Sequence, residues 1–432
     1  MPTDTTEILA TWPRGSRFSQ SLSARLFAIT WRNLWRNKRR TWLTVSGIAF
    51  AVWMIIFSRS VQEGTFDAMI DSGARMMPGH VQIQHRVYQE DPRIDHSFRE
   101  AGLVESLRVQ PGVEFASVRA QGFALLSQGE RSFGAQVIGI EPDVERQWSG
   151  MATMIPQGRY LEQPGEVLIG ATLARNLGLV VGDEMLVLGT AMRGGVAALA
   201  LEVVGIFDSH QPEFNRAVVF GHIADFRDAW GMADDEAHAL VVIAQSVAAG
   251  EDIYERLTNG DHGSGTKVLG WQDLMPEAQQ MRNMKGISSE IVFAVIAIII
   301  TFSVVNTFMM VTFERTAEFG MLQAIGMKLG MIQWQLQIEA LCISVLGVAV
   351  GFAIAFGMIF ALGDSGLPIP VPEEAMEMYA RMNMGDRLYP EFDWGALRTW
   401  GLILLVGVQL AAVIPTLRLR HMRPVDALRH EA

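Results

Sequence analysis

The chain has 432 residues, half of them apolar and only 19% charged, and its formal net charge is −11. A soluble globular protein has about 25% charged residues, so this composition excludes an ordinary soluble protein, and it excludes a disordered chain as well. The single cysteine, Cys342, excludes an internal disulfide framework and any metal site with several cysteine ligands.

The charges are segregated along the chain. Residues 1–40 hold eight Arg and Lys against two acidic residues, whereas residues 62–285 hold 17 against 31, a net of −14. The chain is basic again from Arg418. The basic blocks adjoin long apolar runs, which is typical of a membrane protein rather than of a protein that binds nucleic acid.

An amphipathic helix at the membrane surface is predicted for residues 22–36, within a cytoplasmic N-terminal segment of residues 1–40. Trp31 and Trp35 lie on its apolar face and suit the lipid headgroup boundary, and Arg36 ends it. It would be either a plain anchor or a lever that moves with a partner's ATPase cycle. The basic residues that follow imitate a twin-arginine export signal, but the next apolar run is too long for one and no small-residue cleavage site follows.

Four apolar stretches predict membrane-spanning helices. Each has 21–23 residues. At about 1.5 Å of rise per residue, each is long enough to cross a hydrocarbon core of about 30 Å. The expected spans are residues 41–61, 291–311 (within a helix of residues 287–312), 340–362 and 397–417.

The flanking charges predict the orientation of these spans. Basic clusters precede the first span and follow the last, which places both ends of the chain in the cytoplasm, and an even number of crossings agrees. The acidic segments 62–285 and 363–396 then face the periplasm, while residues 313–339 and the tail 418–432 face the cytoplasm.

The segment 62–285 is predicted to be an α+β domain large enough to bury its own core. Its strands are indicated by alternating or continuous apolar runs that end at glycines, and one short helix stops at Gly178. The expected strands are residues 79–84, 133–140, 166–170, 184–188 and 201–207, and the expected helix is residues 171–177.

Motifs for catalysis, nucleotide binding or metal binding are missing from the sequence. The best imitation of a P-loop, Gly263–Lys267, lacks the Gly-Lys-Ser/Thr order and does not follow a strand. His80, His85 and His96 are close in sequence but are interpreted as surface histidines. We therefore expect no enzyme activity, cofactor or metal in this chain, and any ATP that drives it would bind to a partner.

The link between the second and third spans keeps helical spacing from Glu314 to Ile325. Its small residues would allow another protein's surface to approach closely, so the segment is suited to docking in a groove of another subunit. The alternative is a loop that only reconnects two spans. The expected apolar face is Ala317, Met321, Leu322 and Ile325, and the small residues are Gly320, Ala324 and Gly326.

At this link the sequence resembles a known family. Residues 314–326 closely resemble the "ERtrEiGllrAiGa" signature of the FtsX/MacB-type permeases of ABC transporters. Residues 39–49 resemble that family's first span, residues 158–183 and 203–207 its periplasmic domain, and residues 423–429 its "dPveaLR" tail. The matches occur in the family's order and cover nearly the whole chain.

The resemblance implies a four-helix membrane protein of the bacterial inner membrane with a MacB-like periplasmic α+β domain. It implies two permease chains, identical or related, that pair with two cytoplasmic P-loop ATPase subunits, and ATP bound only by those subunits. The link would act as the coupling helix seated in the ATPase, and movement would pass to the periplasmic domain by mechanotransmission. The coupling residues that it implies are Glu314, Arg315, Glu318, Gly320, Ala324 and Gly326.

Three jobs occur in this family: releasing lipoproteins from the membrane, driving a tripartite efflux or peptide export system, and regulating cell-wall hydrolases. The long 363–396 loop and the absence of a fused ATPase at the N-terminus resemble the lipoprotein-releasing subgroup. The expected cargo is therefore a lipoprotein or another lipid-linked molecule, and a periplasmic carrier is a possible partner. A membrane sensor or scaffold without an ATPase is the alternative from a different class.

Overall fold

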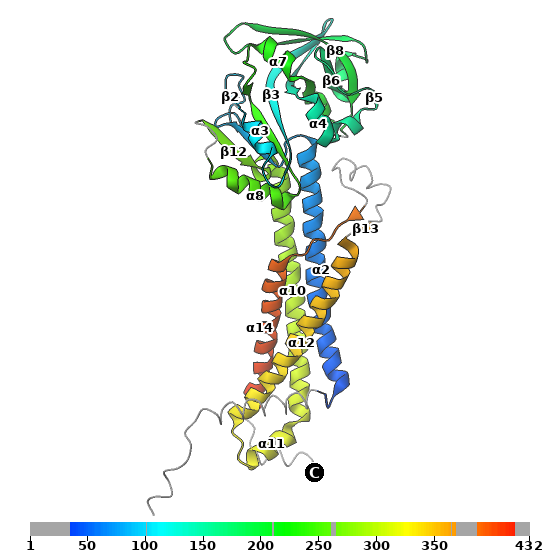
Figure 1. Ribbon diagram of the computed structural model, residues 1–432. Coiled ribbons are helices and arrows are strands. Elements are labelled where there is room, and N and C mark those ends of the chain that lie inside the picture. Colours follow the sequence, from blue (N-terminus) through cyan, green and yellow to red (C-terminus); the bar gives the residue numbers. More distant parts are fainter. Residues whose placement is uncertain are drawn as a thin grey trace, which may run out of the picture. The chain divides into compact units, whose positions relative to one another are not determined.

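The computed structural model describes residues 35–100, 102–209, 211–260, 265–363, 365–368 and 387–419. The chain divides into two compact units, a helical unit and a sheet unit. The helical unit comprises residues 1–63, 285–367 and 389–432, and the sheet unit comprises residues 64–284 and 368–388. Figure 1 shows the long helices and the sheet domain, which confirm the predicted fold class.

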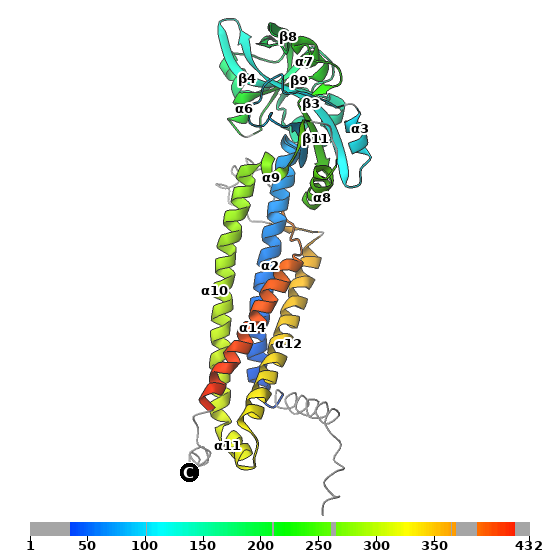
Figure 2. The ribbon, with the colours of Figure 1, turned by 90° about the vertical axis from the view of Figure 1, so that its left-hand side faces the viewer.

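Within the described residues, four helices are long and apolar enough to cross a membrane. They lie side by side in both views (Figures 1 and 2) and share one apolar core, in which Ile48, Phe308 and Leu404 are buried. A short helix, α11 (Thr316–Ala324), joins α10 to α12. The four long helices are α2 (Lys38–Met76), α10 (Pro276–Glu314), α12 (Leu329–Gly363) and α14 (Trp394–Leu419).

The helices are longer than the predicted spans. Helix α2 continues past residue 61 to Met76, and α12 begins at Leu329 rather than at residue 340. The sequence prediction located the apolar stretch that a bilayer requires, whereas a helix continues through polar residues such as Gln335 and Glu339 as long as no breaker intervenes. Residues 1–34, 369–386 and 420–432 lie outside the described residues, and with them most of the amphipathic segment 22–36, much of the 363–396 loop and the tail motif.

Two glycines on α12 bring it close to α2. A Cβ at Gly347 would lie 2.8 Å from the Cβ of Ile48, and one at Gly351 would lie 2.5 Å from the carbonyl oxygen of Ala49. Small residues four apart allow helix backbones to approach closely in a membrane, where dispersion contacts rather than water drive helix association. The packing of the third span on the first therefore requires glycine at both positions.

The sheet unit is built on a ten-stranded sheet in the order β12-β1-β11-β3-β4-β9-β6-β8-β5, with β7 pairing β3 and β8. Its strands are β1 (Val81–His85), β3 (Val113–Gln128), β4 (Arg131–Ile140), β5 (Gln157–Gly158), β6 (Glu166–Gly170), β7 (Glu184–Thr190), β8 (Val196–Phe207), β9 (Val218–His222), β11 (Ala239–Ala244) and β12 (Thr266–Gly270). Smaller pairs are β2 (Phe98–Arg99) with β10 (Glu236–Ala237), and β13 (Leu367–Pro368) with β14 (Arg387–Leu388). Strand β6 has the bounds that the sequence predicts.

Short helices accompany the sheet, and they are α3 (Leu103–Arg108), α4 (Pro142–Trp148), the 3-10 helix η1 (Gly150–Met154), α5 (Ala171–Leu177), α6 (Phe214–Ala217), α7 (Ile223–Trp230), α8 (Val247–Thr258) and α9 (Trp271–Leu274). Helix α5 has the predicted bounds and ends at Gly178, whose φ of 79° is the left-handed conformation that glycine adopts without strain.

The sheet has two large apolar cores, and a smaller cluster of Trp148, Ala239, Val241 and Ile243 is separate from both. The first core contains most of the buried aliphatic residues together with Phe226 and Trp230, whose rings stack at 4.2 Å. The second core lies on strands β4, β6, β8 and β9 with the segment around η1. Its buried members are Ile138, Ile140, Met151, Tyr160, Leu161, Leu168, Val204, Phe207, Val218 and Phe220.

The domain is entered and left on neighbouring strands. Helix α2 leads through residues 77–80 into β1, while β12 leads through α9 into α10. Strands β1 and β12 pair antiparallel, with Val81 opposite Gly270. The two long helices are therefore connected to adjacent, hydrogen-bonded strands at one end of the strand order.

A buried histidine makes the stability of this domain depend on pH. His238 is fully buried; its Nδ1 accepts the amide of Gln121 at 3.1 Å, and its Nε2 lies 3.0 Å from the carbonyl oxygen of Ile94. These partners suit the neutral ring, with the proton on Nε2. Burial lowers the pKa of His238 from 6.5 to about 4. The unfolded chain therefore takes up a proton at a pH where the folded chain does not.

We predict that the domain loses roughly 3 kcal/mol of stability as the pH falls from 6.5 to 4 because of this residue. His238→Gln keeps a donor and an acceptor but cannot titrate, so its stability should change less over that range. Hydrogen exchange of β3 and β11 in the full-length protein measures the difference. An unchanged pH dependence in the variant would contradict the assignment.

Candidate functional site

The link predicted to be a coupling helix forms α11 between α10 and α12. Helix α10 ends at Glu314, and the backbone breaks at Arg315, which precedes the first turn of α11. At the other end Gly326 has a φ of 101°, Gly326 N donates to the Gln323 carbonyl, and Met327 N donates to the Leu322 carbonyl. This is the hydrogen-bond pattern of a glycine-terminated helix. The role of Gly326 is therefore to end α11 and turn the chain toward α12.

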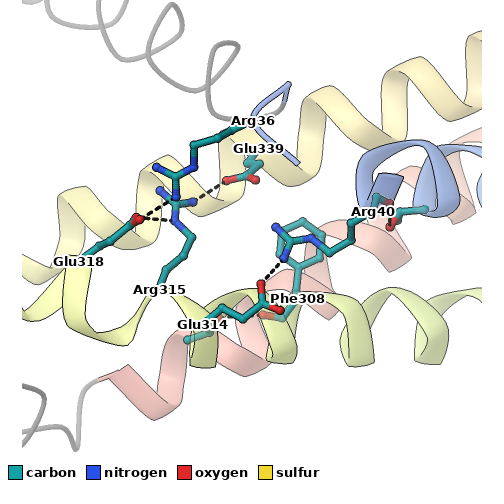
Figure 3. A network of polar contacts seen from close by, with 9 residues as sticks. Arg36, Arg40, Phe308, Glu314, Arg315, Glu318 and Glu339 are labelled. Atoms are coloured by element: carbon teal, nitrogen blue, oxygen red, sulfur yellow. Dashed lines mark hydrogen bonds and ion pairs between the residues drawn. The ribbon is translucent and has the colours of Figure 1, made fainter. Parts of the chain in front are cut away.

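Two ion pairs connect this link to the start of α2. Arg36 Nη2 lies 2.7 Å from Glu318 Oε1, and Arg40 Nη1 lies 2.7 Å from Glu314 Oε2 (Figure 3). The partners are 282 and 274 residues apart in sequence. The structure thus brings the basic N-terminal cluster and the acidic residues of the link to the same end of the helical unit.

Arg315 joins the link to α12 in a more buried contact. Its Nε lies 3.0 Å from Glu318 Oε2, and its Nη1 lies 3.4 Å from Glu339 Oε2. The side chains of Arg315 and Glu339 are only 10% and 6% exposed, and the guanidinium also lies 5.1 Å from the ring of Phe319. Because Glu339 is withdrawn from water, removing Arg315 would leave it without this ion-pair partner at high cost, whereas Arg315 would still contact Glu318 if Glu339 were removed. Figure 3 shows Arg36 and Arg315 converging on Glu318.

Glu318 is the shared member of this charged network, which comprises Arg36, Arg40, Glu314, Arg315, Glu318 and Glu339. Partial burial alone would raise the pKa of Glu318, but hydrogen bonds from Arg315 and Arg36 outweigh it and hold the pKa below its ordinary value. The carboxylate is therefore ionised at neutral pH and can bridge the two arginines.

The apolar side chains of α11 divide between two directions. Phe319 is buried against Ile332 and Leu336 of α12, and Leu322 packs on the same cluster. Leu322 thus turns inward and does not share one face with Met321 and Ile325, contrary to the prediction from the sequence. Met321 and Ile325 are 55% and 79% exposed. These two residues form the exposed apolar surface of the helix.

The remaining predicted residues are placed as follows. Gly320 is buried, whereas Ala324 and Gly326 are exposed beside Ile325. Trp35 packs partly on the membrane-helix core and lies edge-on to Trp42 at 6.2 Å, and Trp31 lies outside the described residues.

Sequence reasoning missed Arg40, Glu339 and Phe319 as members of the site. Glu339 could have been noticed as the one acidic residue inside the long apolar helix α12.

The histidines differ in part from their interpretation as surface residues. His80 is fully buried, because it lies at the start of β1 where the strand enters the sheet. His85 and His96 are half-buried and stack at 5.2 Å. Among the described residues, no group of three or more His, Cys, Asp and Glu is arranged to hold a metal ion.

Comparison with known families finds a matching family model for each of the two units. The FtsX-like permease C-terminal family matches residues 290–424, and the MacB-like periplasmic core domain matches residues 41–259. Four spans with such a domain inserted after the first define a membrane permease. The chain belongs to the FtsX/MacB-type family of ABC transporter permeases, which confirms the resemblance seen in the sequence.

Individual relatives are similar at modest identity. The chain is 23% identical over 408 residues to the lipoprotein-releasing system transmembrane protein LolC of Neisseria meningitidis serogroup B, covering 90% of this chain and 94% of that protein. It is 22% identical over 377 residues to the macrolide export ATP-binding/permease protein MacB of Hyphomonas neptunium, covering 79% of this chain but only 54% of that protein.

Two solved structures are similar to part of the chain. The periplasmic region of MacB from Actinobacillus actinomycetemcomitans has a TM-score of 0.34 and 13% identity, covering 46% of this chain and 92% of that one. The extracellular domain of the transporter YknZ from Gram-positive bacteria has a TM-score of 0.33 and 14% identity, covering 44% of this chain and 99% of that one.

The turn at Gly326 gives a prediction for the geometry of the link. Gly326→Ala meets no neighbouring atom but places a Cβ at positive φ, so it should cost roughly 1 kcal/mol and loosen the last turn of α11. Hydrogen exchange at Met327 should then accelerate several-fold. Gly330→Ala, at an equally open position inside α12, is the matched control and should not accelerate it. Equal behaviour of the two variants would contradict the assigned turn.

Proposed function

We propose that this ABC transporter permease is driven by a separate cytoplasmic P-loop ATPase, that α11 is the coupling helix seated in that ATPase, and that movement passes along the helices to the periplasmic domain. The observation that carries the proposal is the charged network, because it ties the link of residues 314–325 to the start of α2 and to α12. A displacement of the link would pass to α12 through the buried contacts and to the start of α2 through the exposed pairs.

The contacts of the network differ in how strongly they hold the link. The pairs Arg36–Glu318 and Arg40–Glu314 are partly exposed, and such pairs contribute about 0–1 kcal/mol each, so they guide α11 rather than lock it. The buried pair Arg315–Glu339 and the packing of Phe319 are the firm attachment. A push on α11 would therefore move the start of α12 directly and steer the start of α2.

The same contacts support the cytoplasmic location of α11. Arg36 and Arg40 belong to the basic cluster that precedes the first span, and they contact Glu318 and Glu314. Because short basic flanks are retained in the cytoplasm, the link that they contact would lie there as well. Both termini would then be cytoplasmic and the MacB-like domain periplasmic, in a bacterial inner membrane.

For the cargo, we favour a lipoprotein or another lipid-linked molecule, moved by two permease chains together with a possible periplasmic carrier. The similarity to a lipoprotein-releasing LolC protein over most of both chains supports this choice. The second candidate is a tripartite efflux or peptide export system, which the similarity to a macrolide exporter supports over a smaller share of the relative.

The exposed apolar surface of α11 predicts the ATPase contact. The variant Met321→Asp/Ile325→Asp should abolish copurification of a P-loop ATPase in mild detergent, because the ATPase groove would have to bury two charges, while membrane insertion stays normal. Gln323→Asp adds charge to the same helix at a half-buried polar position and serves as the control. A chain that purifies alone even as wild type would instead be a sensor or scaffold.

The ion pair between Arg40 and Glu314 allows a charge-swap test of transmission. Arg40→Glu or Glu314→Arg alone should lower cargo release per ATP hydrolysed several-fold, because like charges then face each other across 2.7 Å. The double variant Arg40→Glu/Glu314→Arg should recover most of the loss. The measurement is cargo release per ATP in the reconstituted complex. If both single variants release cargo as well as wild type, the proposed transmission through this pair is wrong.

A further inference from the structure

The end of α2 is anchored in the sheet domain by a tight turn. After Met76 the chain passes through Met77 and Pro78 to Gly79. His80, the residue before β1, then donates its backbone N–H to the Val242 carbonyl of β11. Gly79 has a φ of 74°, and a Cβ there would lie 2.5 Å from Cγ1 of Val241. The turn is therefore short and closely packed, and its backbone hydrogen bond connects the end of α2 to β11.

A buried arginine holds this turn from another strand. Arg119, on β3, is 3% exposed and donates through Nη1 to the carbonyl oxygen of Met77 at 2.5 Å. Its Nε and Nη2 donate to the two carboxylate oxygens of Glu145 at 2.6 and 2.7 Å. Glu145 lies on α4, is 2% exposed and also accepts the hydroxyl of Ser117 at 3.1 Å. We call Met77, Arg119 and Glu145 the α2 clamp.

The α2 clamp joins parts of the domain that the sheet order separates. Strand β1 lies near one end of the order, whereas the second core lies on β4, β9, β6 and β8. The side chain of Met77 packs against that second core, while its carbonyl oxygen is held by Arg119. Helix α4, which carries Glu145, leads directly into η1 and Met151 of the second core.

Stability alone does not account for this arrangement. A buried ion pair is weak evidence for stability, because apolar residues of similar volume often replace one without loss. What an apolar pair cannot supply is a directional bond to a backbone carbonyl at the end of a helix. The other polar contacts of this helix end come from Arg75 and Asp71. Arg75 contacts Glu114 on β3 and the Ala244 carbonyl at the end of β11, and Asp71 contacts His80 before β1, so none of them leads to the second core.

We propose that Arg119 and Glu145 are positioning residues that fix the domain-side end of α2 to the second core, so that movement of α2 reaches that core instead of being absorbed by the turn at Met77–Gly79. The inference rests on the proposed function, in which α2 carries movement to the domain. Arg119 is the centre of the clamp because one guanidinium serves both the helix end and α4.

The first arm of the test measures the clamp without any partner. In full-length protein with Cys342→Ser, spin labels on Ala68→Cys of α2 and Gln147→Cys of α4, both exposed positions in the sheet unit, report one distance distribution. Arg119→Met/Glu145→Met removes the charges together, which avoids leaving one buried and unpaired. We expect this variant to broaden the distribution while hydrogen exchange of β11 stays within about twofold of wild type.

A matched pair in the same domain provides the control. Arg159 pairs with Glu166, whose side chain is 7% exposed, but neither residue contacts α2. Arg159→Met/Glu166→Gln keeps an acceptor for the amides of Glu162 and Gln163 that Glu166 now serves. This variant should leave the label distribution unchanged.

The second arm measures function in the complex with the copurified ATPase. Arg119→Met/Glu145→Met should leave ATP hydrolysis unchanged but lower cargo release per ATP about tenfold, whereas the control variant should lower neither. An unchanged label distribution, or a broadened one with full release, would overturn the inference. A broadened distance distribution in a protein that binds no ATPase would support the clamp and overturn the proposed function. Failure of the inference and failure of the proposed function are therefore distinguishable.

Discussion

A helix inside a bilayer has to satisfy all of its backbone hydrogen bonds within itself, because hydrocarbon offers no partners. In this protein the helices that meet this constraint extend beyond the apolar stretch, because no proline interrupts them there. Helix α2 is one uninterrupted helix from Lys38 to Met76, and α10 is one from Pro276 to Glu314. An uninterrupted helix transmits displacement along its axis, so the element that makes the membrane crossing possible also makes mechanical coupling possible.

Polar contacts hold α2 near both of its ends and at Arg59 in its middle. Near its start, Arg36 and Arg40 contact the link between α10 and α12; at its other end, the Met77 carbonyl is held by Arg119. Arginine is suited to both places, because its planar guanidinium bonds two acceptors at once and keeps its charge when buried. Between the two ends, Arg59 pairs with Glu63, Glu290 and Asp393. The rest of the helix packs there through apolar residues and close glycine contacts such as Gly351 on Ala49, which are less directional.

The sequence predicted those features that depend on local pattern. The four spans follow from apolar length, and β6 with α5 follows from a buried apolar run, a helical period and Gly178. The ends of α2 and α12 could not be found in this way, because the bilayer limits the apolar stretch but not the helix.

Strands β3 and β11 were missed. Strand β11 is a continuous apolar run of the same kind as β6 and could have been found. Strand β3 has no such pattern, because polar residues such as Ser117 and Arg119 are buried among its apolar ones. The partners in the charged network were beyond reach as well, since an ion pair such as Arg40–Glu314 depends on the packing of helices far apart in sequence.

The pairing of Val81 with Gly270 has a consequence for the history of such proteins. Because the domain begins and ends on adjacent strands, its two attachment points are separated only by the spacing of one strand pair, about 5 Å. A domain with neighbouring ends can be enlarged, trimmed or replaced without altering how the supporting helices pack. The helical unit can thus keep its packing while the inserted domain changes in size or sequence.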